Sequence, residues 1–146
     1  MFVGGIVGDS RSENNYIYIN NCYNIGTVEY NGARNGGGVV GVAQRNITKC
    51  YNLGNLISSE NMGGIVGSDY GVSISDSYYL TGVASTAVAY DANSGKMLPE
   101  DQLGKGMPMD KSDMPSILSV VNKDNEFIED VTNINDGYPV LKWQVE

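Results

Sequence analysis

The chain has 146 residues and a formal net charge of −8, with 9 basic side chains, 17 acidic side chains and no histidine. This length supports one domain with a modest core. Nucleic acids and anionic membranes are bound through clusters of lysine and arginine, so the acidic balance excludes both from the expected partners. The missing imidazole excludes Ser/His/Asp catalysis, Cys/His catalysis and most zinc sites.

Composition changes near residue 85. Residues 1–85 hold 15 of the 19 glycines and carry a net charge of −2, whereas residues 86–146 hold 4 glycines and carry −6. We expect a repeat domain over residues 1–85 and a capping segment over residues 86–146. No apolar run approaches the roughly 20 residues of a membrane span, and the start at Met1 has no leader-like pattern. We therefore expect no membrane insertion and interpret the chain as a soluble fragment of a longer protein.

Three short phrases recur along the first part of the chain. The first phrase reads Gly4-Gly5-Ile6-Val7-Gly8, Gly37-Gly38-Val39-Val40-Gly41 and Gly63-Gly64-Ile65-Val66-Gly67. The second reads Ile19-Asn20-Asn21-Cys22-Tyr23-Asn24, Ile47-Thr48-Lys49-Cys50-Tyr51-Asn52 and Ile74-Ser75-Asp76-Ser77-Tyr78-Tyr79. The third reads Gly26-Thr27-Val28, Gly54-Asn55-Leu56 and Gly82-Val83-Ala84. The glycine phrases begin 33 and then 26 residues apart, which is the period of a repeat array.

Each unit contains three apolar segments, separated by glycine, asparagine or serine, that are too short for helices. They predict three brief strands per unit. One such unit has no partner for its apolar side, but stacked units bury it. The expected fold is mainly β: a three-coil parallel β-solenoid (β-helix), right-handed, with a small mixed α/β cap at the C-terminus. Equivalent residues would then lie about 4.8 Å apart on neighbouring strands.

This geometry assigns the repeated positions to rows. The inward rows are expected to be Ile6/Val39/Ile65, Ile19/Ile47/Ile74 and Val28/Leu56/Ala84. Alternation sends Val7/Val40/Val66 outward, and Tyr23/Tyr51/Tyr78 form an aromatic ladder that we place on the outer surface. Glycine serves tight turns or positive φ at Gly5/Gly38/Gly64, Gly8/Gly41/Gly67 and Gly26/Gly54/Gly82. Asn24 and Asn52 stack beside the last of these rows, where Tyr79 interrupts the asparagines.

The capping segment has its own local signals. Residues 99–103 predict one helical turn, and residues 113–121 predict a short helix with an acidic start and a proline in its first turn. The tripeptide at 135–137 is a turn signal. It leads into a last strand over residues 138–143, whose alternation places Leu141 and Trp143 on one face as cap core.

Two regions of the first unit are candidate binding surfaces. The polar stretches 9–18 and 30–35 are longer than their counterparts, and extra loops on one face of a repeat array often bind ligands. The edge at residues 2–7 has no preceding strand to pair with, so we expect it to favour self-association.

Cys22 and Cys50 fall on adjacent units, so their side chains are expected to be neighbours. In-register parallel strands hold Cβ atoms farther apart than the roughly 3.8 Å that a disulfide prefers. Ser77 occupies the same row, which indicates a slot for a small side chain. Free thiols are favoured over a disulfide, which stays open as the alternative.

The ionisable residues give weak site signals. A neighbouring Lys49/Asp76 pair fits the row geometry, but a solvated cross-strand contact is favoured over catalysis. The acidic run at 124–136 offers oxygen ligands, yet it lacks the EF-hand spacing, so a solvated acidic face is favoured over a calcium site. We therefore expect no catalytic residue, no cofactor and no bound metal.

Taken together, the GG[IV]VG phrase, I-x-x-[CS]-Y-[NY] and the glycine that follows resemble the GLUG repeat of bacterial surface and secreted proteins, over roughly residues 3–85. The tail resembles the segment that closes such arrays, with Leu98-Pro99-Glu100-Asp101-Gln102-Leu103 and Gly137-Tyr138-Pro139-Val140-Leu141-Lys142-Trp143-Gln144. The third unit departs from the pattern through Ser77 and Tyr79, as a terminal repeat often does.

This resemblance implies a non-catalytic structural or adhesive module at the cell surface or outside the cell. Its partners would be neighbouring repeats or domains of a longer chain, or a host glycan or protein. A carbohydrate-binding or carbohydrate-processing β-helix is the competing class, which carboxylates and exposed aromatic rings along one groove would favour. An accessory domain of a larger surface peptidase is the third class of function.

Overall fold

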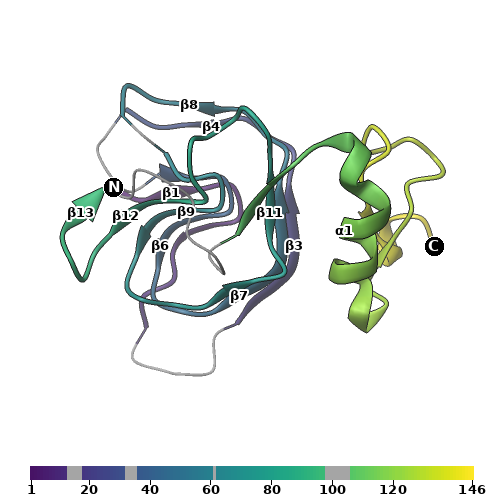
Figure 1. Ribbon diagram of the computed structural model, residues 1–146, viewed down its shortest axis with the longest axis horizontal. Helices are drawn as coiled ribbons and strands as arrows, with labels where there is room; N and C mark the ends of the chain where they lie inside the picture. The colour runs from purple at the N-terminus through teal and green to yellow at the C-terminus, as the bar shows by residue number, and fades with distance from the viewer. Residues whose placement is uncertain (13–17, 32–35, 61, 98–105) are drawn as a thin grey trace.

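Parallel β-strands make up most of the regular structure in the computed structural model (Figure 1), which describes residues 1–12, 18–31, 36–60, 62–97 and 106–146. Helical structure is confined to α1 (Met114–Val121) and to three short 3-10 turns, η1 (Lys111–Asp113), η2 (Asn122–Asp124) and η3 (Lys142–Gln144), within that part of the chain. The expectation of a mainly β fold is therefore confirmed. No helix in the described ranges is long and apolar enough to span a membrane.

One five-stranded sheet contains the glycine phrases. Its order is β13 (Lys96–Met97), β12 (Val88–Asp91), β9 (Val66–Asp69), β6 (Val40–Ala43) and β2 (Val7–Asp9). All pairs are parallel except β12 with β13. The register aligns Val7 with Val40, Val40 with Val66, and Val66 with Val88. Equivalent positions of successive repeat units thus lie on neighbouring strands.

A second five-stranded sheet contains the tyrosine phrases. Its strands are β3 (Ile19–Asn24), β7 (Ile47–Asn52), β10 (Ile74–Ser75), β11 (Tyr78–Leu80) and β14 (Met107–Met109). β7 pairs in parallel with β3 on one side and with both β10 and β11 on the other. Ile19 aligns with Ile47 and Cys22 with Cys50. The prediction that these equivalent residues lie on adjoining strands is confirmed.

The remaining strands form three two-stranded sheets. β1 (Val3–Gly4) pairs in parallel with β5 (Gly36–Gly37), and β4 (Val28–Glu29) pairs in parallel with β8 (Leu56–Ile57). In the C-terminal segment, β15 (Phe127–Ile128) pairs antiparallel with β16 (Val140–Leu141). We call β1–β4 the first unit, β5–β8 the second and β9–β11 the third. Figure 1 shows their strands following similar paths, with α1 and the C-terminus beside them.

A left-handed residue recurs at the same place in each unit. Asn21, Lys49 and Asp76 have φ values of 52°, 52° and 49°. A residue of this kind inside a strand acts as a bulge and shifts the alternation of side chains by one position. This is why Ile19 and Cys22, three residues apart, contact the same core. Asparagine and aspartate tolerate the conformation well, whereas Lys49 adopts it against its preference.

The first core lies between the strands of the repeat units. It contains the buried side chains of Ile19, Ile47 and Ile74, as predicted for that row. Val39 and Ile65 are also buried, but their counterpart Ile6 is 42% exposed because the described chain places no unit beyond the first. In the third predicted inward row, Val28 is buried whereas Leu56 and Ala84 are half-buried.

The outward prediction for Val7, Val40 and Val66 is wrong. Val40 and Val66 are fully buried, and Val7 packs against the same core. Simple alternation fails here because two consecutive N–H groups donate to one carbonyl. Those of Ile65 and Val66 both donate to Ala87 O, at 2.9 Å each, and the pattern recurs in the other units. The bulge bends the chain, so both side chains of each pair are available for burial.

Most repeat glycines are needed for close approach rather than for positive φ, which corrects the sequence-based reason. In the row Gly26/Gly54/Gly82, only Gly82 has a positive φ, of +89°. A Cβ on Gly54 would lie 1.9 Å from the carbonyl oxygen of Gly26 on the neighbouring unit. A Cβ on Gly64 would lie 2.3 Å from Cγ of Tyr79. These positions exclude a side chain because neighbouring chain segments already fill the space.

A second core joins the tyrosine row to the C-terminal segment. Its buried members are Tyr51, Met109, Ile117, Val121, Phe127 and Tyr138. The rings of Tyr23 and Tyr51 stack with centroids 5.0 Å apart and planes at 8°. The predicted ladder is thus present for this pair, but its outer-surface placement is wrong for Tyr51, which is fully buried beneath the C-terminal segment.

The C-terminal segment follows several of its local signals. The helix predicted over 113–121 is confirmed as α1, with Asp113 at its N-cap. The turn at 135–137 is confirmed, because the N–H of Tyr138 donates to Asn135 O at 2.9 Å and the two residues between them have positive φ. Leu141 packs against the second core, but Trp143 is 69% exposed in η3. Its assignment to the cap core is wrong because the extended strand ends at Leu141.

The parallel pairing does not end at residue 85, where the repeat sequence stops. β12 continues the sheet beyond β9, and β14 continues the other sheet beyond β11. The backbone of residues 88–91 and 107–109 therefore extends the packing of the repeat units without repeating their sequence. The helical turn predicted at 99–103 lies outside the described residues.

Candidate functional site

The first unit presents an edge that the rest of the described chain leaves unpaired. Its strands β1, β2, β3 and β4 each pair with one strand of the second unit, namely β5, β6, β7 and β8. Within the described ranges no strand pairs with their opposite edges. We call this surface the N-terminal face.

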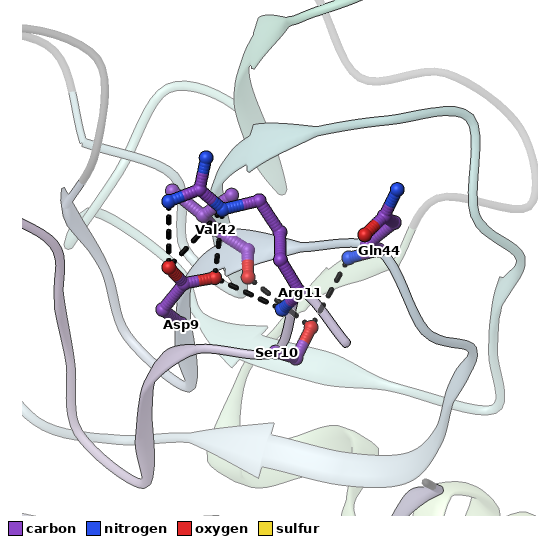
Figure 2. Close-up of polar contacts among 5 residues, drawn as sticks. All are labelled: Asp9, Ser10, Arg11, Val42 and Gln44. Carbon is purple, nitrogen blue, oxygen red and sulfur yellow. Dashed lines mark hydrogen bonds and ion pairs between the residues drawn. The ribbon is translucent and has the colours of Figure 1, made fainter. Parts of the chain in front are cut away.

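A polar corner lies directly after β2 in the first unit. Ser10 Oγ donates to the carbonyl oxygen of Val42 at 3.2 Å and accepts the N–H of Gln44 at 3.1 Å (Figure 2). The side chain of Ser10 is buried and spans the first and second units. These bonds fix the chain where it leaves the sheet.

Asp9 and Arg11 form an ion pair beside this corner. The Arg11 guanidinium donates from Nε to both carboxylate oxygens and from Nη2 to Oδ2 at 2.7 Å (Figure 2). The Arg11 hydrogen bonds hold the pKa of Asp9 below its ordinary value. The guanidinium also lies 4.5 Å from the ring centroid of Phe2. Charged side chains of this kind limit unspecific pairing at an exposed strand end.

Cys22 of β3, in the first unit, aligns with Cys50 of β7, in the second unit. Both are free thiols, with Cys22 half-buried and Cys50 buried. Free thiols were the favoured prediction, and they are what the structure contains. A hydrogen bond from the Cys50 thiol lowers the pKa of Cys22 to about 7, against the opposing effect of burial. The same hydrogen bond and burial raise the pKa of Cys50. Cys22 therefore has the more reactive thiol, because the thiolate is the nucleophile.

Asparagine side chains link the first two units beside the glycine corner. Asn24 Nδ2 donates to Asn52 Oδ1 at 2.8 Å and to Gly26 O at 2.8 Å. Each asparagine also accepts the N–H of the glycine two residues later, at 3.1 Å for Gly26 and 3.2 Å for Gly54. The predicted stacking of Asn24 and Asn52 is therefore confirmed, and its hydrogen bonds run in one direction along the units.

A groove lies between the repeat units and the C-terminal segment. It has a volume of about 330 Å³, and its walls come from Ile25, Leu53 and Leu80 on the units and from Ile134–Asp136 and Tyr138 on the cap. Ile25 and Ile134 are 57% and 50% exposed. The groove combines an aliphatic wall with the polar groups of a turn, which is a common composition for small ligand sites.

The carboxylate of Asp130 stabilises a turn of the cap. Asp130 accepts backbone N–H groups from Ile134, Asn135 and Gly137 at 3.0, 2.7 and 3.0 Å. Burial alone would raise the pKa of Asp130, but these hydrogen bonds lower it below the ordinary value. Among the described residues no group of three or more histidine, cysteine, aspartate or glutamate side chains is placed to hold a metal ion.

Lys49, which the sequence placed beside Asp76, forms an ion pair with Asp124 of the cap. The sequence could not reveal this contact, because it depends on how the cap folds back. The same holds for Tyr51, whose hydroxyl donates to Pro139 O and accepts from Asn135 Nδ2 at 3.0 Å. Tyr23 similarly donates to Gln144 Oε1 at 2.8 Å. The sequence marked Tyr23 and Tyr51 only as a repeated tyrosine and did not indicate which cap residues they contact.

Comparison with family models, curated proteins and solved structures finds no match to this chain.

Proposed function

We propose that the chain is a non-catalytic structural or adhesive module of a bacterial cell-surface or secreted protein, built as a three-coil, right-handed β-solenoid with a C-terminal cap. The observation that carries the proposal is the register between units. Ile47 pairs with Ile19 on one side and with Ile74 on the other, and the left-handed residue recurs at one position in all three units. A pattern of this kind suits a chain that extends by adding units.

The use of the charged side chains supports this role. Asp9 pairs with Arg11, Asp124 pairs with Lys49, and Asp130 holds three backbone N–H groups. Each contact fixes a chain end, a loop or the cap, so these groups serve the architecture. The resemblance to GLUG repeats supports an extracellular setting and the neighbouring repeats of a longer chain as partners. The same resemblance is also compatible with an accessory domain of a surface peptidase.

The groove beside the cap favours a second candidate, a carbohydrate-binding domain. Asn135 and Asp136 bring polar groups to an apolar wall, and Tyr138 lines the same depression. Sugars combine apolar faces with hydroxyl groups, so they match this mixed lining. The volume of about 330 Å³ limits the occupant to a small saccharide or one unit of a longer glycan.

A binding array of immobilised glycans and host surface proteins separates the two candidates, with a polysaccharide digestion assay beside it. The module role predicts no release of reducing ends, and any protein or surface binding should survive Ile25→Asp, at a groove side chain that is 57% exposed. Glycan binding that Ile25→Asp abolishes would replace the module role with the second candidate. Catalytic turnover of a polysaccharide would contradict both. Ser94→Asp, on the turn between β12 and β13, is a matched charge control.

A further inference from the structure

The asparagine hydrogen bonds leave one acceptor unused at the N-terminal face. Asn52 Oδ1 accepts two donors, the N–H of Gly54 and Nδ2 of Asn24. Asn24 Oδ1 accepts only the N–H of Gly26 from the described chain. Asn24 is 8% exposed as a residue, and its amide oxygen has one donor where the oxygen of Asn52 has two. The missing donor would come from the side opposite the second unit.

Gly26 and its counterpart Gly54 also differ in what covers them. A Cβ on Gly54 would lie 1.9 Å from Gly26 O, so that position requires glycine. A Cβ on Gly26 would meet nothing closer than Asn24 Oδ1 at 3.4 Å, which is ordinary contact. Gly26 also lacks a positive φ. The described protein therefore gives no steric reason for glycine at this position, whereas a carbonyl placed over it would give one.

Apolar side chains of the first unit are more exposed than their counterparts in the later units. Ile6 is 42% exposed, whereas its counterparts Val39 and Ile65 are fully buried. Cys22 is half-buried, whereas Cys50 is buried. The strands of the first unit also keep one edge without a strand partner in the described chain. The strand edges, the apolar side chains and the amide oxygen of the first unit thus all lack a contact on the N-terminal face that their counterparts in the second unit have.

We infer that the N-terminal face binds one further unit of this same repeat, in parallel and in register. Its asparagine would donate to Asn24 Oδ1, its glycine carbonyl would cover Gly26, and its aliphatic side chain would cover Ile6. This inference rests on the proposed role as a repeat module and identifies the chemistry of the partner at that face. The contacts are those that the first unit makes with the second.

A second copy of this protein does not fit the face. If two N-terminal faces met, each Asn24 Oδ1 would need a donor from the other Asn24. Both N–H groups of Asn24 Nδ2 are already donated, one to Asn52 and one to Gly26. On the side away from the first unit, β11 and β12 already pair with β14 and β13, so among the described strands of the second and third units a head-to-tail copy would meet only the two-residue outer edges of β8 and β10. The added unit must therefore bring its own asparagine amide.

A four-unit variant tests the inference. A copy of residues 36–61, with its Cys50 changed to Ser, is inserted between Phe2 and Val3, which preserves the repeat register. We expect its melting temperature to rise and alkylation of Cys22 by iodoacetamide to slow by at least about tenfold, as for a thiol that becomes buried. Gly26→Ala should leave the parent protein unchanged but lower the melting temperature of the four-unit variant.

The matched control carries Asn52→Asp in the inserted copy, because aspartate keeps the shape but removes the donor. It should regain much of the Cys22 reactivity. The inference is overturned if Cys22 stays equally reactive, if Gly26→Ala is neutral in both proteins, or if the four-unit variant melts at or below the parent. Sedimentation of the parent as a dimer with protected Cys22 would assign the face to a second copy. None of these readouts depends on the glycan and protein array, so the two proposals fail separately.

Discussion

At the scale of single residues, the need for glycine is set by the neighbouring unit. Gly54 and Gly26 occupy equivalent positions with ordinary φ, yet only Gly54 has a carbonyl oxygen where its Cβ would lie. Sequence alone marks both positions as repeat glycines and attributes them to a turn. The contact that matters joins two chain segments 28 residues apart, so it follows from the register of the units and not from the local dipeptide.

Gly54→Ala should destabilise the protein by about 1–3 kcal/mol, the usual cost of forcing a methyl group into filled space. Gly26→Ala is the matched control and should change the free energy of unfolding by less than about 0.5 kcal/mol, as for a surface substitution. Urea unfolding followed by circular dichroism measures both. Equal losses for the two variants would contradict the close approach of the first and second units at this corner.

Cys22 should be the thiol that reacts in the folded protein. Because its pKa is lowered to about 7, the thiolate fraction and the rate of alkylation by iodoacetamide should rise with pH through about 7 and level off above it. Mass spectrometry should find one modified residue, and Cys22→Ser should abolish the reaction.

Cys50→Ala supplies the control, because it removes the donor that stabilises the Cys22 thiolate. The midpoint of the pH profile should then move up toward the ordinary thiol value of about 8.5. Rapid modification of Cys50 in the native protein, or an unchanged midpoint in Cys50→Ala, would contradict the arrangement of the pair.

At the scale of elements, Tyr51 joins β7 to the C-terminal segment. Its ring stacks on Tyr23 and lies 5.6 Å from the Phe127 ring, and burial raises the pKa of its hydroxyl. That hydroxyl bonds to Pro139 and Asn135, so one side chain contacts both the chain before β16 and the turn at 135–137. Aromatic pairs of this kind contribute about 0.5–1.5 kcal/mol beyond their buried area.

Tyr51→Phe should lower the free energy of unfolding by about 1 kcal/mol, because the ring packing remains and one buried hydrogen-bonding group is lost. The loss stays moderate because Asn135 Nδ2 still donates to Pro139 O at 3.0 Å. Tyr18→Phe, at a side chain that is 68% exposed, should have no effect. Thermal unfolding by calorimetry gives both values, and a neutral Tyr51→Phe would contradict the docking of the cap on this tyrosine.

The phase of the short strands was the hardest feature to predict from sequence. The rows Ile19/Ile47/Ile74 and Cys22/Cys50 follow from repeat spacing alone, since spacing fixes which residues are neighbours. Whether a side chain is buried depends also on bulges. The left-handed residue at Asn21 shifts the alternation, and so does the bulge at Val39 and Val40, whose N–H groups both donate to Ile65 O; neither feature was predicted from the sequence. Val40 was therefore assigned to the wrong side.

At the scale of the whole molecule, sequence predicted the parallel pairing of equivalent residues but not the second core. The tyrosine row looked like a surface ladder because its covering partners, Phe127 and Tyr138, are distant in sequence and belong to no repeat. The exposure of Trp143 was also missed, because it depends on the path of the chain after Leu141, which the sequence pattern did not predict. Of the candidate site, the spacing predicted the neighbouring cysteines and asparagines. The direction of the asparagine hydrogen bonds required the structure.

The register of all three units is tested most directly by a distance between the first and the third. Asn20 and Ser75 are both exposed, and each pairs with Thr48, from opposite sides of β7. In a background with Cys22→Ser and Cys50→Ser, nitroxide labels at Asn20→Cys and Ser75→Cys would sit two strand spacings apart, about 10 Å. Continuous-wave EPR should show strong dipolar broadening that the singly labelled proteins lack. Spectra of the doubly labelled protein that equal the sum of the single spectra would contradict the stacking of the three units.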